Sequence, residues 1–250
     1  MELEYGLQLY SIADFTEYDM EYALPFLAEY GYKSVEFAGY FGHSAEQIND
    51  MLSKNGLKVI GSHIGLDILT EEKINATLDF EEAIGNKNIV FPCIDLDNAE
   101  KIKNVVPQII RVQKETDRRG MKLHYHTHDW DFLPNDDGII PAKALEQETG
   151  VLFEIDTFWA FFAGLDPVAE MRRLRNVGRC ELVHIKDGKP NRDPAVIGEG
   201  FAPIIDIVEE ADKLGLYKIV ESEGYIPDGL TDVRHCLKYL KKIASGEITK

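Results

Sequence analysis

Three histidines occupy alternate positions of the segment LHYHTHDWDF, and their spacing is the strongest chemical signal in the chain. His124, His126 and His128 lie in a segment with the pattern of a β-strand, where successive side chains point to opposite faces. All three imidazoles are therefore expected on one face. Neutral imidazole is the commonest metal ligand among side chains and titrates close to neutral pH. The segment predicts one wall of an active site that performs metal or acid–base chemistry.

Polar side chains also end or interrupt the other expected strands. In chain order they are Gln8, Tyr10, Glu36, His63, Asp95, His126, His128, Asp156, His184, Lys186, Glu221 and Glu223. A carboxylate that faces a barrel interior is costly unless it is paired, neutralised or bound to a metal. Asp156, His184 and Glu221, together with a histidine of the fifth strand, would supply nitrogen and oxygen ligands. This mixed set suits Mn²⁺, Zn²⁺, Fe²⁺ or Co²⁺.

A second layer of polar residues is expected beneath this set. His124 lies two positions before His126 on the same strand, and Glu154 lies two positions before Asp156. A pair between His124 and Glu154 would orient a metal ligand from below. The alternative is an ion pair of the core without a functional role. In that case the substitution Glu154→Gln leaves metal affinity unchanged.

Short apolar segments rich in β-formers alternate with longer amphipathic segments. The expected strands are Tyr5–Ser11, Ser34–Ala38, Lys58–Ile64, Asn88–Ile94, Lys122–His128, Val151–Asp156, Glu181–Lys186 and Lys218–Ser222. Expected helices include Ala45–Lys54, Glu71–Ile84, Ala99–Arg119 and Ala202–Leu214. Several helical segments end at a glycine suited to a C-cap, namely Gly31, Gly56, Gly85, Gly120, Gly150 and Gly215.

This alternation predicts βαβ units and a parallel sheet. About eight units in this length fit an α/β fold of the (β/α)₈ TIM-barrel type, formed as a single domain over residues 1–250. The alternative is a doubly wound sheet, which is disfavoured because no glycine-rich nucleotide loop follows any strand. In such a barrel the C-terminal ends of all strands meet at one face, so the polar strand ends would come together.

Composition limits the partners. The formal net charge of −17 opposes binding to nucleic-acid phosphates and to anionic membranes, although it does not oppose a divalent cation. Cys93, Cys180 and Cys236 show no CxxC spacing, which indicates reduced thiols. The N-terminal segment lacks a signal-peptide pattern, and no apolar run is long enough to span a bilayer. We expect a cytoplasmic protein with no nucleic-acid or membrane partner; a homo-oligomer is left open.

The chain resembles the sugar phosphate isomerase/epimerase-like proteins of the xylose isomerase-type TIM-barrel superfamily. The matching pieces, in family order over essentially the whole chain, are GLQLYS, SVEFAG, GSHIG, LHYHTHDWDF, FEIDTFWAFFAGLDP, LVHIKDGK, IGEGFAP and IVESEG. The resemblance implies a divalent metal at Asp156, His184 and Glu221, with His126 as the ligand from the fifth strand. Mn²⁺ is the first expectation, with Zn²⁺, Co²⁺, Fe²⁺ or Mg²⁺ as alternatives.

Many relatives carry Glu where this chain has His126. Epimerases of the superfamily exchange protons through two metal-bound glutamates, and only Glu221 of that pair is present here. His126, His128 or Glu154 would have to replace the other.

The resemblance implies an isomerase or epimerase that acts on a small-molecule sugar or keto-sugar. Its chemistry would be proton abstraction next to a carbonyl and a metal-stabilised enediolate. The candidate catalytic residues are Glu221, His63, His128, Glu36 and Lys186, and the candidate substrate contacts are Gln8, Tyr10, Trp159 and Lys186. Gln8, Tyr10 and Glu36 can instead have structural roles at the barrel mouth, and the aromatic side chains can be packing residues.

Other functions stay open. One is a metal-dependent lyase or dehydratase, or an enzyme that cleaves 3-keto-glycosides. Another is a barrel that binds a sugar or metal without turnover. A DNA-repair endonuclease of the same fold is disfavoured by the acidic charge. The only candidates for binding phosphate are Lys186, Lys189 and Arg192, so we expect a non-phosphorylated sugar.

Overall fold

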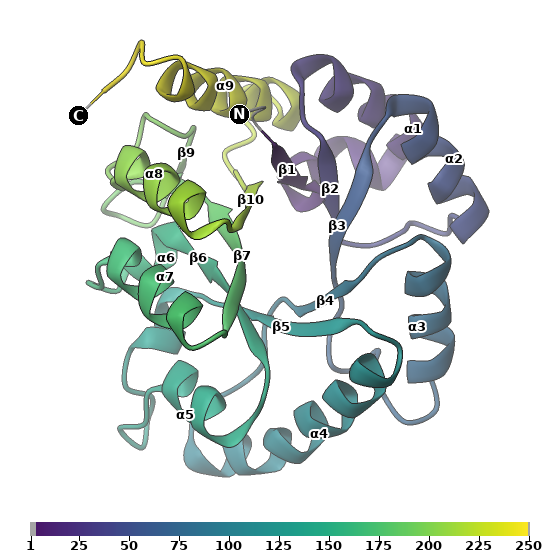
Figure 1. The fold of residues 1–250 in the computed structure, drawn as a ribbon, viewed down its shortest axis with the longest axis vertical. Helices are drawn as coiled ribbons and strands as arrows, with labels where there is room; N and C mark the ends of the chain where they lie inside the picture. The colour runs from purple at the N-terminus through teal and green to yellow at the C-terminus, as the bar shows by residue number, and fades with distance from the viewer. Residues whose placement is uncertain (1–3, 250) are drawn as a thin grey trace.

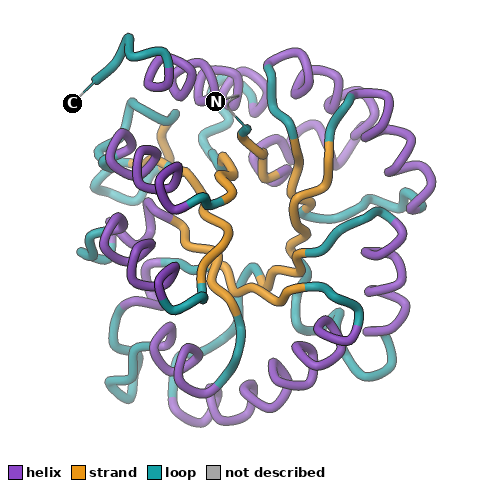
Figure 2. The backbone as a smooth tube through the Cα atoms, in the orientation of Figure 1, coloured by secondary structure: helices purple, strands orange, loops and turns teal. Residues whose placement is uncertain are grey.

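The computed structural model describes residues 4–249. Eight parallel strands close into a barrel in the order β1–β10–β7–β6–β5–β4–β3–β2. Their bounds are β1 Tyr5–Gln8, β2 Ser34–Phe37, β3 Lys58–His63, β4 Asn88–Phe91, β5 Lys122–His126, β6 Leu152–Asp156, β7 Cys180–Ile185 and β10 Tyr217–Val220. The barrel lies at the centre of the molecule, within a ring of helices (Figures 1 and 2). The predicted (β/α)₈ fold is confirmed.

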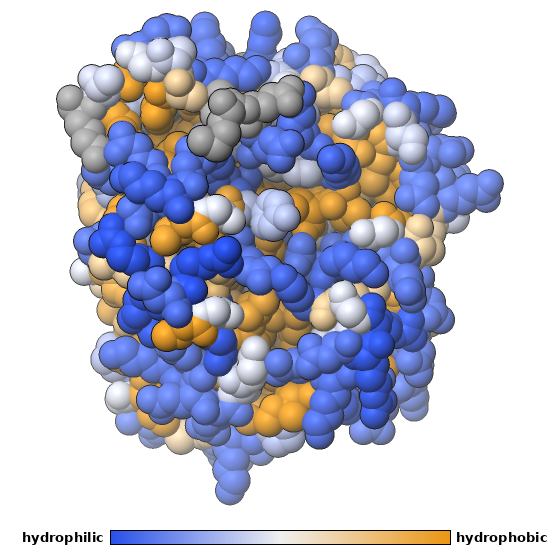
Figure 3. All heavy atoms as spheres, in the orientation of Figure 1, coloured by the Kyte–Doolittle hydropathy of each residue, from blue (hydrophilic) through white to orange (hydrophobic). Residues whose placement is uncertain are grey.

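The helices lie between successive strands, except that α9 follows the last strand. They are α1 Ala13–Tyr30, α2 Ala45–Asn55, α3 Ile74–Ala83, α4 Ala99–Arg118, α5 Pro141–Glu148, α6 Thr157–Phe162, α7 Pro167–Asn176, α8 Ile204–Leu214 and α9 Gly229–Ala244. Within the described residues, no helix has both the length and the apolar character that a membrane crossing requires. Figure 3 shows hydrophilic residues over most of the visible face, with hydrophobic side chains in scattered patches between them.

Helix α4 illustrates how the sequence pattern forms the core. Its buried apolar side chains are Ile102, Val105, Val106, Ile109 and Val112. This spacing of three and four residues places them on one face of the helix, which packs toward the barrel. The charged residues between them remain at the surface.

Several strands end earlier than predicted, and β4 stops three residues early, at Phe91. Two of the shorter strands, β1 and β5, change the setting of candidate site residues. β1 stops at Gln8, because the Gln8 side chain accepts a hydrogen bond from the Tyr10 backbone and starts a 3₁₀ turn, η1 Leu9–Ile12. β5 stops at His126, and His128 precedes a second 3₁₀ turn, η2 Asp129–Phe132. The prediction that all three histidines lie within one strand is therefore wrong for His128.

Two further differences concern loops. Five of the six predicted C-cap glycines have a left-handed φ, but Gly150 does not, because α5 ends in the extended residue Thr149. A short antiparallel pair, β8 Asp187–Gly188 and β9 Pro194–Ala195, follows β7 and was not predicted. The Asp187 carboxylate accepts backbone N–H bonds from Gly198, Gly200 and Ala202, and so fixes the GEG loop. A Cβ at Gly200 would lie 2.0 Å from this carboxylate, which explains the glycine.

Candidate functional site

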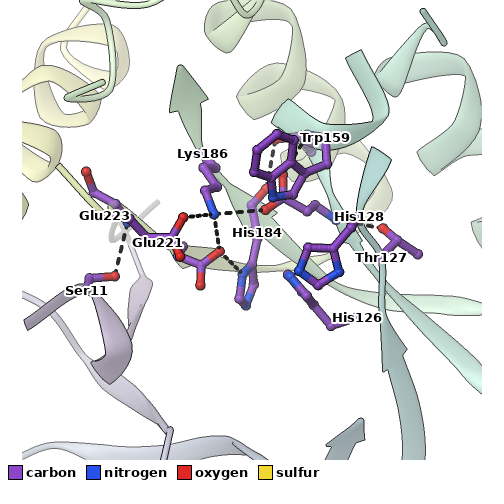
Figure 4. A network of polar contacts seen from close by, with 12 residues as sticks. Ser11, His126, Thr127, His128, Trp159, His184, Lys186, Glu221 and Glu223 are labelled. Atoms are coloured by element: carbon purple, nitrogen blue, oxygen red, sulfur yellow. Dashed lines mark hydrogen bonds and ion pairs between the residues drawn. The ribbon is translucent and has the colours of Figure 1, made fainter. Parts of the chain in front are cut away.

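Four predicted metal ligands converge at the C-terminal ends of β5, β6, β7 and β10. Asp156 pairs in register with His184 on the neighbouring strand, and Glu221 follows β10 directly. One donor atom from each of His126, Asp156, His184 and Glu221 lies within 4.8 Å of the others, and all four residues are buried. We call these four residues the donor group. Figure 4 shows His126, His184 and Glu221 side by side.

Asp156 provides the clearest sign that the donor group suits a cation. Its Oδ1 accepts the backbone N–H of Trp159 at 2.9 Å and caps α6. Its Oδ2 is buried and has no hydrogen-bond partner among the described residues. Burial raises the pKa of Asp156 to about 7, although nearby Lys186 opposes this effect. Two imidazoles and two carboxylates therefore offer a donor set that fits Mn²⁺, Zn²⁺, Fe²⁺ or Co²⁺.

Glu154 lies beneath the donor group and contacts three imidazoles. Its Oε2 is 2.9 Å from His63 Nε2, 3.1 Å from His126 Nδ1 and 3.2 Å from His184 Nε2. The prediction that His124 pairs with Glu154 is wrong, because His124 Nε2 instead lies 3.1 Å from Asn88 Oδ1 on β4. Glu154 instead orients two members of the donor group directly.

A second set of donors overlaps the first. His63, His126, Glu154 and His184 also place donor atoms within 4.8 Å of one another. This set shares two imidazoles with the donor group, and Glu154 Oε2 already lies within 3.2 Å of three ring nitrogens, so the donor group is the set better suited to hold a metal. Glu154 then fixes which ring nitrogen each histidine presents upward.

The carboxylates around His184 determine its charge in the metal-free protein. His184 Nε2 is 2.8 Å from Glu36 Oε2, and its Nδ1 is 3.1 Å from Glu221 Oε2. Burial lowers the pKa of His184, but Glu154 and Glu221 outweigh burial and hold the pKa well above its usual range. A metal ion would have to displace the proton from the nitrogen that it binds.

Glu36 and Gln8 lie behind His184 rather than at an open surface. Gln8 Nε2 donates to Glu36 Oε2 at 2.8 Å, and both residues are fully buried. Gly61 on β3 makes room for this carboxylate, because a Cβ there would lie 2.6 Å from Glu36 Oε1. His63, at 3.3 Å from Glu36 Oε2, joins the same network. Glu36 and Gln8 are thus placed to position His184.

Lys186 lies between the acid at the end of β6 and the two acids that follow β10. Its Nζ lies 3.0 Å from Glu221 Oε2, 2.7 Å from Glu223 Oε2 and 3.8 Å from Asp156 Oδ2 (Figure 4). Burial lowers its pKa, but these carboxylates raise the pKa above its usual range, so the ammonium stays charged. Glu223 was noticed as a strand-end acid but not assigned a role. Its spacing of two residues from Glu221 was the available signal.

Aromatic rings form the wall beside β5. The His128 ring stacks on Trp130 at 4.3 Å and lies 6.4 Å from Trp159. The pKa of His128 is lowered to about 2, mainly by burial and further by the nearby His126 and Lys186. Its ring is therefore neutral. The His128 Nδ1 has no hydrogen-bond partner among the described residues. Trp130 was not predicted as a site residue, although it follows the histidines in LHYHTHDWDF.

The remaining predicted contacts lie at the mouth. Tyr10 is half exposed on η1, and Lys186 lies 5.2 Å from the Trp159 ring. The guanidinium of Arg192, on the β8–β9 turn, covers the Trp159 ring at 5.0 Å. Arg192 also donates two hydrogen bonds to Asp129, one of them at 3.0 Å, and so ties the β8–β9 turn to η2.

Comparisons with known proteins agree with this architecture. A family model described as the xylose isomerase-like TIM barrel matches residues 24–243. One sugar phosphate isomerase/epimerase from Parabacteroides distasonis is 24% identical, with a TM-score of 0.81 over 96% of this chain and 98% of the other. A second from the same organism is 25% identical, with a TM-score of 0.79 over 96% and 94%.

The same fold occurs in a protein with a different name. A probable 3-DHS dehydratase from Bacillus anthracis is 13% identical, with a TM-score of 0.71 over 96% of this chain and 99% of the other. No curated protein matches the sequence. Because the family model covers most of the chain, the chain belongs to the xylose isomerase-like TIM-barrel family.

Proposed function

We propose that the protein is a divalent-metal-dependent sugar isomerase or epimerase. The observation that carries this proposal is the convergence of His126, Asp156, His184 and Glu221. The buried Asp156 Oδ2 has no hydrogen-bond partner among the described residues. The family and its sugar isomerase/epimerase relatives support a sugar as substrate. A metal at this group, with Mn²⁺ as our first choice, would supply a Lewis acid for a sugar carbonyl.

The protein's own residues would bind the substrate and move its protons. The Lys186 ammonium, held between Glu221 and Glu223, would donate a hydrogen bond to an oxygen that gains negative charge. Glu221 uses Oε2 for Lys186 and His184, and we assign proton removal to this carboxylate. Trp159 would contact the sugar from the aromatic wall.

Proton return requires a second group. His63 and His128 both neighbour His126, with ring centroids at 5.1 Å and 4.8 Å respectively. We propose that one of these imidazoles replaces the glutamate that many relatives carry on the fifth strand. Burial lowers the pKa of His63, but Glu36 and Glu154 outweigh burial and raise it to about 10, so His63 carries a proton at neutral pH. The neutral His128 ring does not, which favours His63 as the group that returns the proton.

The substrate is proposed to be non-phosphorylated. Arg192 is already paired with Asp129, and Lys186 is surrounded by carboxylates. Neither Lys186 nor Arg192 is therefore available as a strong phosphate ligand, and the exposed Lys189 remains as the single other candidate.

An alternative within the same chemistry is elimination of a group next to the carbonyl. The stacked His128 and Trp130 beside the donor group favour this reading, since they could receive a leaving group. Release of an aglycone or water from a 3-keto-sugar, without formation of an epimer, would identify it.

Solvent-deuterium exchange tests the proposal directly. The protein is loaded with Mn²⁺ and incubated in D₂O with a panel of ketoses, keto-sugars and inososes, and deuterium incorporation is followed by NMR. We expect exchange that a chelator stops and that Asp156→Asn lowers by more than about 100-fold, beyond the loss typical of an outer residue. Absence of exchange across the panel by protein with measured Mn²⁺ content would refute the isomerase proposal.

A further inference from the structure

A groove lies directly beyond the aromatic wall of the site. Its volume is about 560 Å³, which falls within the range of small-molecule sites, about 300–1,000 Å³. It runs between the loop after β4 and the loop after β5 and η2. Its lining includes Trp130, Leu133, Pro134, Asp95, Asp97 and Asp136.

The two walls of the groove are fastened to each other. Asn135 Nδ2 donates to the Leu96 carbonyl at 2.9 Å, and the Asp136 N–H donates to the Asp97 carbonyl at 3.0 Å. The Ala99 N–H donates to an Asp137 oxygen at 2.8 Å. These bonds keep the groove preformed, so a ligand would pay little to order it.

The groove combines apolar surface with hydrogen-bond acceptors. Trp130 and Leu133 are 44% and 42% exposed, which is high for such side chains. Asp95 and Asp97 share one cation, Lys101, at 2.7 and 2.8 Å, and Asp136 adds a further carboxylate. This surplus of negative charge repels phosphates and carboxylates but accepts hydrogen bonds from hydroxyl groups. An aromatic face beside carboxylates therefore suits a neutral sugar ring.

A second cavity beside the site has a different character. It has a volume of about 330 Å³ and is lined by His63, Tyr40, Ile64, Ile68 and Phe80, with Glu81 at its edge. Both Glu81 oxygens already accept hydrogen bonds from protein groups. This cavity offers few acceptors to a polyhydroxylated ligand, so the groove at Trp130 is the better sugar site.

Two stacked rings lie between the groove and the donor group. Trp130 lies against His128 at 4.3 Å, and His128 lies next to His126 at 4.8 Å. We propose that the groove binds a second, neutral glycosyl unit of the substrate, whose reacting ring occupies the donor group. The substrate is then a glycoside such as a disaccharide rather than a free monosaccharide. The assignment of the reacting ring rests on the proposed function; the glycosyl site does not.

Cys93 provides a probe that requires neither metal nor turnover. It lines the groove and is exposed, whereas Cys180 and Cys236 are buried. The full chain, kept metal-free with a chelator, is labelled with a thiol reagent in the presence of cellobiose, maltose, trehalose or glucose. At about ten times its dissociation constant a ligand fills most sites, so we expect one disaccharide to slow labelling about tenfold. Glucose at the same concentration should slow it far less.

Variants determine whether protection arises in the groove. Trp130→Ala should abolish protection and Trp130→Phe should retain part of it, with the thermal unfolding midpoint confirming that both variants fold. Tyr217 is an exposed aromatic residue at the start of β10 and serves as the control. In the Tyr217→Ala variant, the disaccharide should protect Cys93 as well as it does in the wild type. The proposal is overturned if no disaccharide protects Cys93, or if glucose 1-phosphate protects it better than every disaccharide does. It is also overturned if the disaccharide protects Cys93 fully in the Trp130→Ala variant. Protection without any deuterium exchange would leave the groove intact and refute the isomerase proposal instead.

Discussion

Two buried polar clusters lie on either side of β3, and they differ in how fully their hydrogen bonds are satisfied. The lateral cluster, between the barrel and α3, consists of Tyr40, Ser62, Glu81 and Asn86. The central cluster, inside the barrel, consists of Glu36, His63, His126, Glu154, Asp156, His184 and Glu221. Both contain fully buried carboxylates.

In the lateral cluster, the protein itself supplies every partner of the carboxylate. Glu81 Oε1 accepts from Tyr40 at 2.6 Å, and Glu81 Oε2 accepts from Ser62 at 2.9 Å and Asn86 at 2.8 Å. In the central cluster, Glu36, Glu154 and Asp156 each keep one buried oxygen without a hydrogen-bond partner among the described residues. Since buried polar atoms are rarely unpaired, this difference supports the proposal that the central cluster takes a bound species, whereas the Glu81 carboxylate of the lateral cluster is fully paired.

The largest expected effect separates two equally buried glutamates. Glu154→Gln removes the charge that orients three imidazoles, so we expect metal affinity to fall by about 10–100-fold. Glu81→Gln is the matched control, because it neutralises a buried carboxylate that contacts no member of the donor group. Each variant is stripped of metal with a chelator and titrated with Mn²⁺ or Zn²⁺, and calorimetry gives the dissociation constant of the metal. Equal affinities for Glu154→Gln and the wild type would show that Glu154 is a core ion-pair residue.

The donor group was predictable because each member ends an apolar strand. Asp156, His184 and Glu221 are recognisable one strand at a time, and barrel closure brings them together. The contacts of Glu154 were not predictable, because the carboxylate meets His63, 91 positions away, across the interior. Its placement also depends on an irregularity of register between Phe153 and Glu154, which no periodicity signals.

The lateral cluster was missed for a different reason. Glu81 lies on α3 within a predicted amphipathic segment, where an acidic residue is expected to face solvent. It is fully buried because the Tyr40 hydroxyl and the Asn86 amide reach it from other segments. Likewise, His128 lies outside β5 because the Asp131 carboxylate accepts its backbone N–H at 2.7 Å, and the chain turns there.

A smaller effect is expected on stability at the lateral cluster. Glu81→Gln replaces one acceptor oxygen with an amide group that only donates, so the buried hydrogen bonds of this side chain must rearrange around a neutral partner. We expect the free energy of unfolding to fall by about 1–3 kcal/mol at neutral pH. Urea unfolding of the metal-free protein measures this difference. A variant as stable as the wild type would mean that the lateral cluster rearranges, and that the full set of hydrogen bonds to Glu81 contributes little to the free energy of unfolding.

The smallest effect is the pH dependence of that same difference. Burial raises the pKa of Glu81 above the ordinary value of 4.5, despite the opposing hydrogen bonds from Tyr40, Asn86 and Ser62. Because this acid holds its proton more tightly when folded, its favourable contribution is complete below pH 4.5 and is lost as pH rises through the folded-state pKa. Glu81→Gln has no such titration, so the stability gap between wild type and variant should narrow as pH rises. Urea unfolding of both proteins from about pH 4 to about pH 8 measures the gap. A gap that widens with pH would show that the ionised carboxylate, not the protonated one, is the form that the lateral cluster prefers.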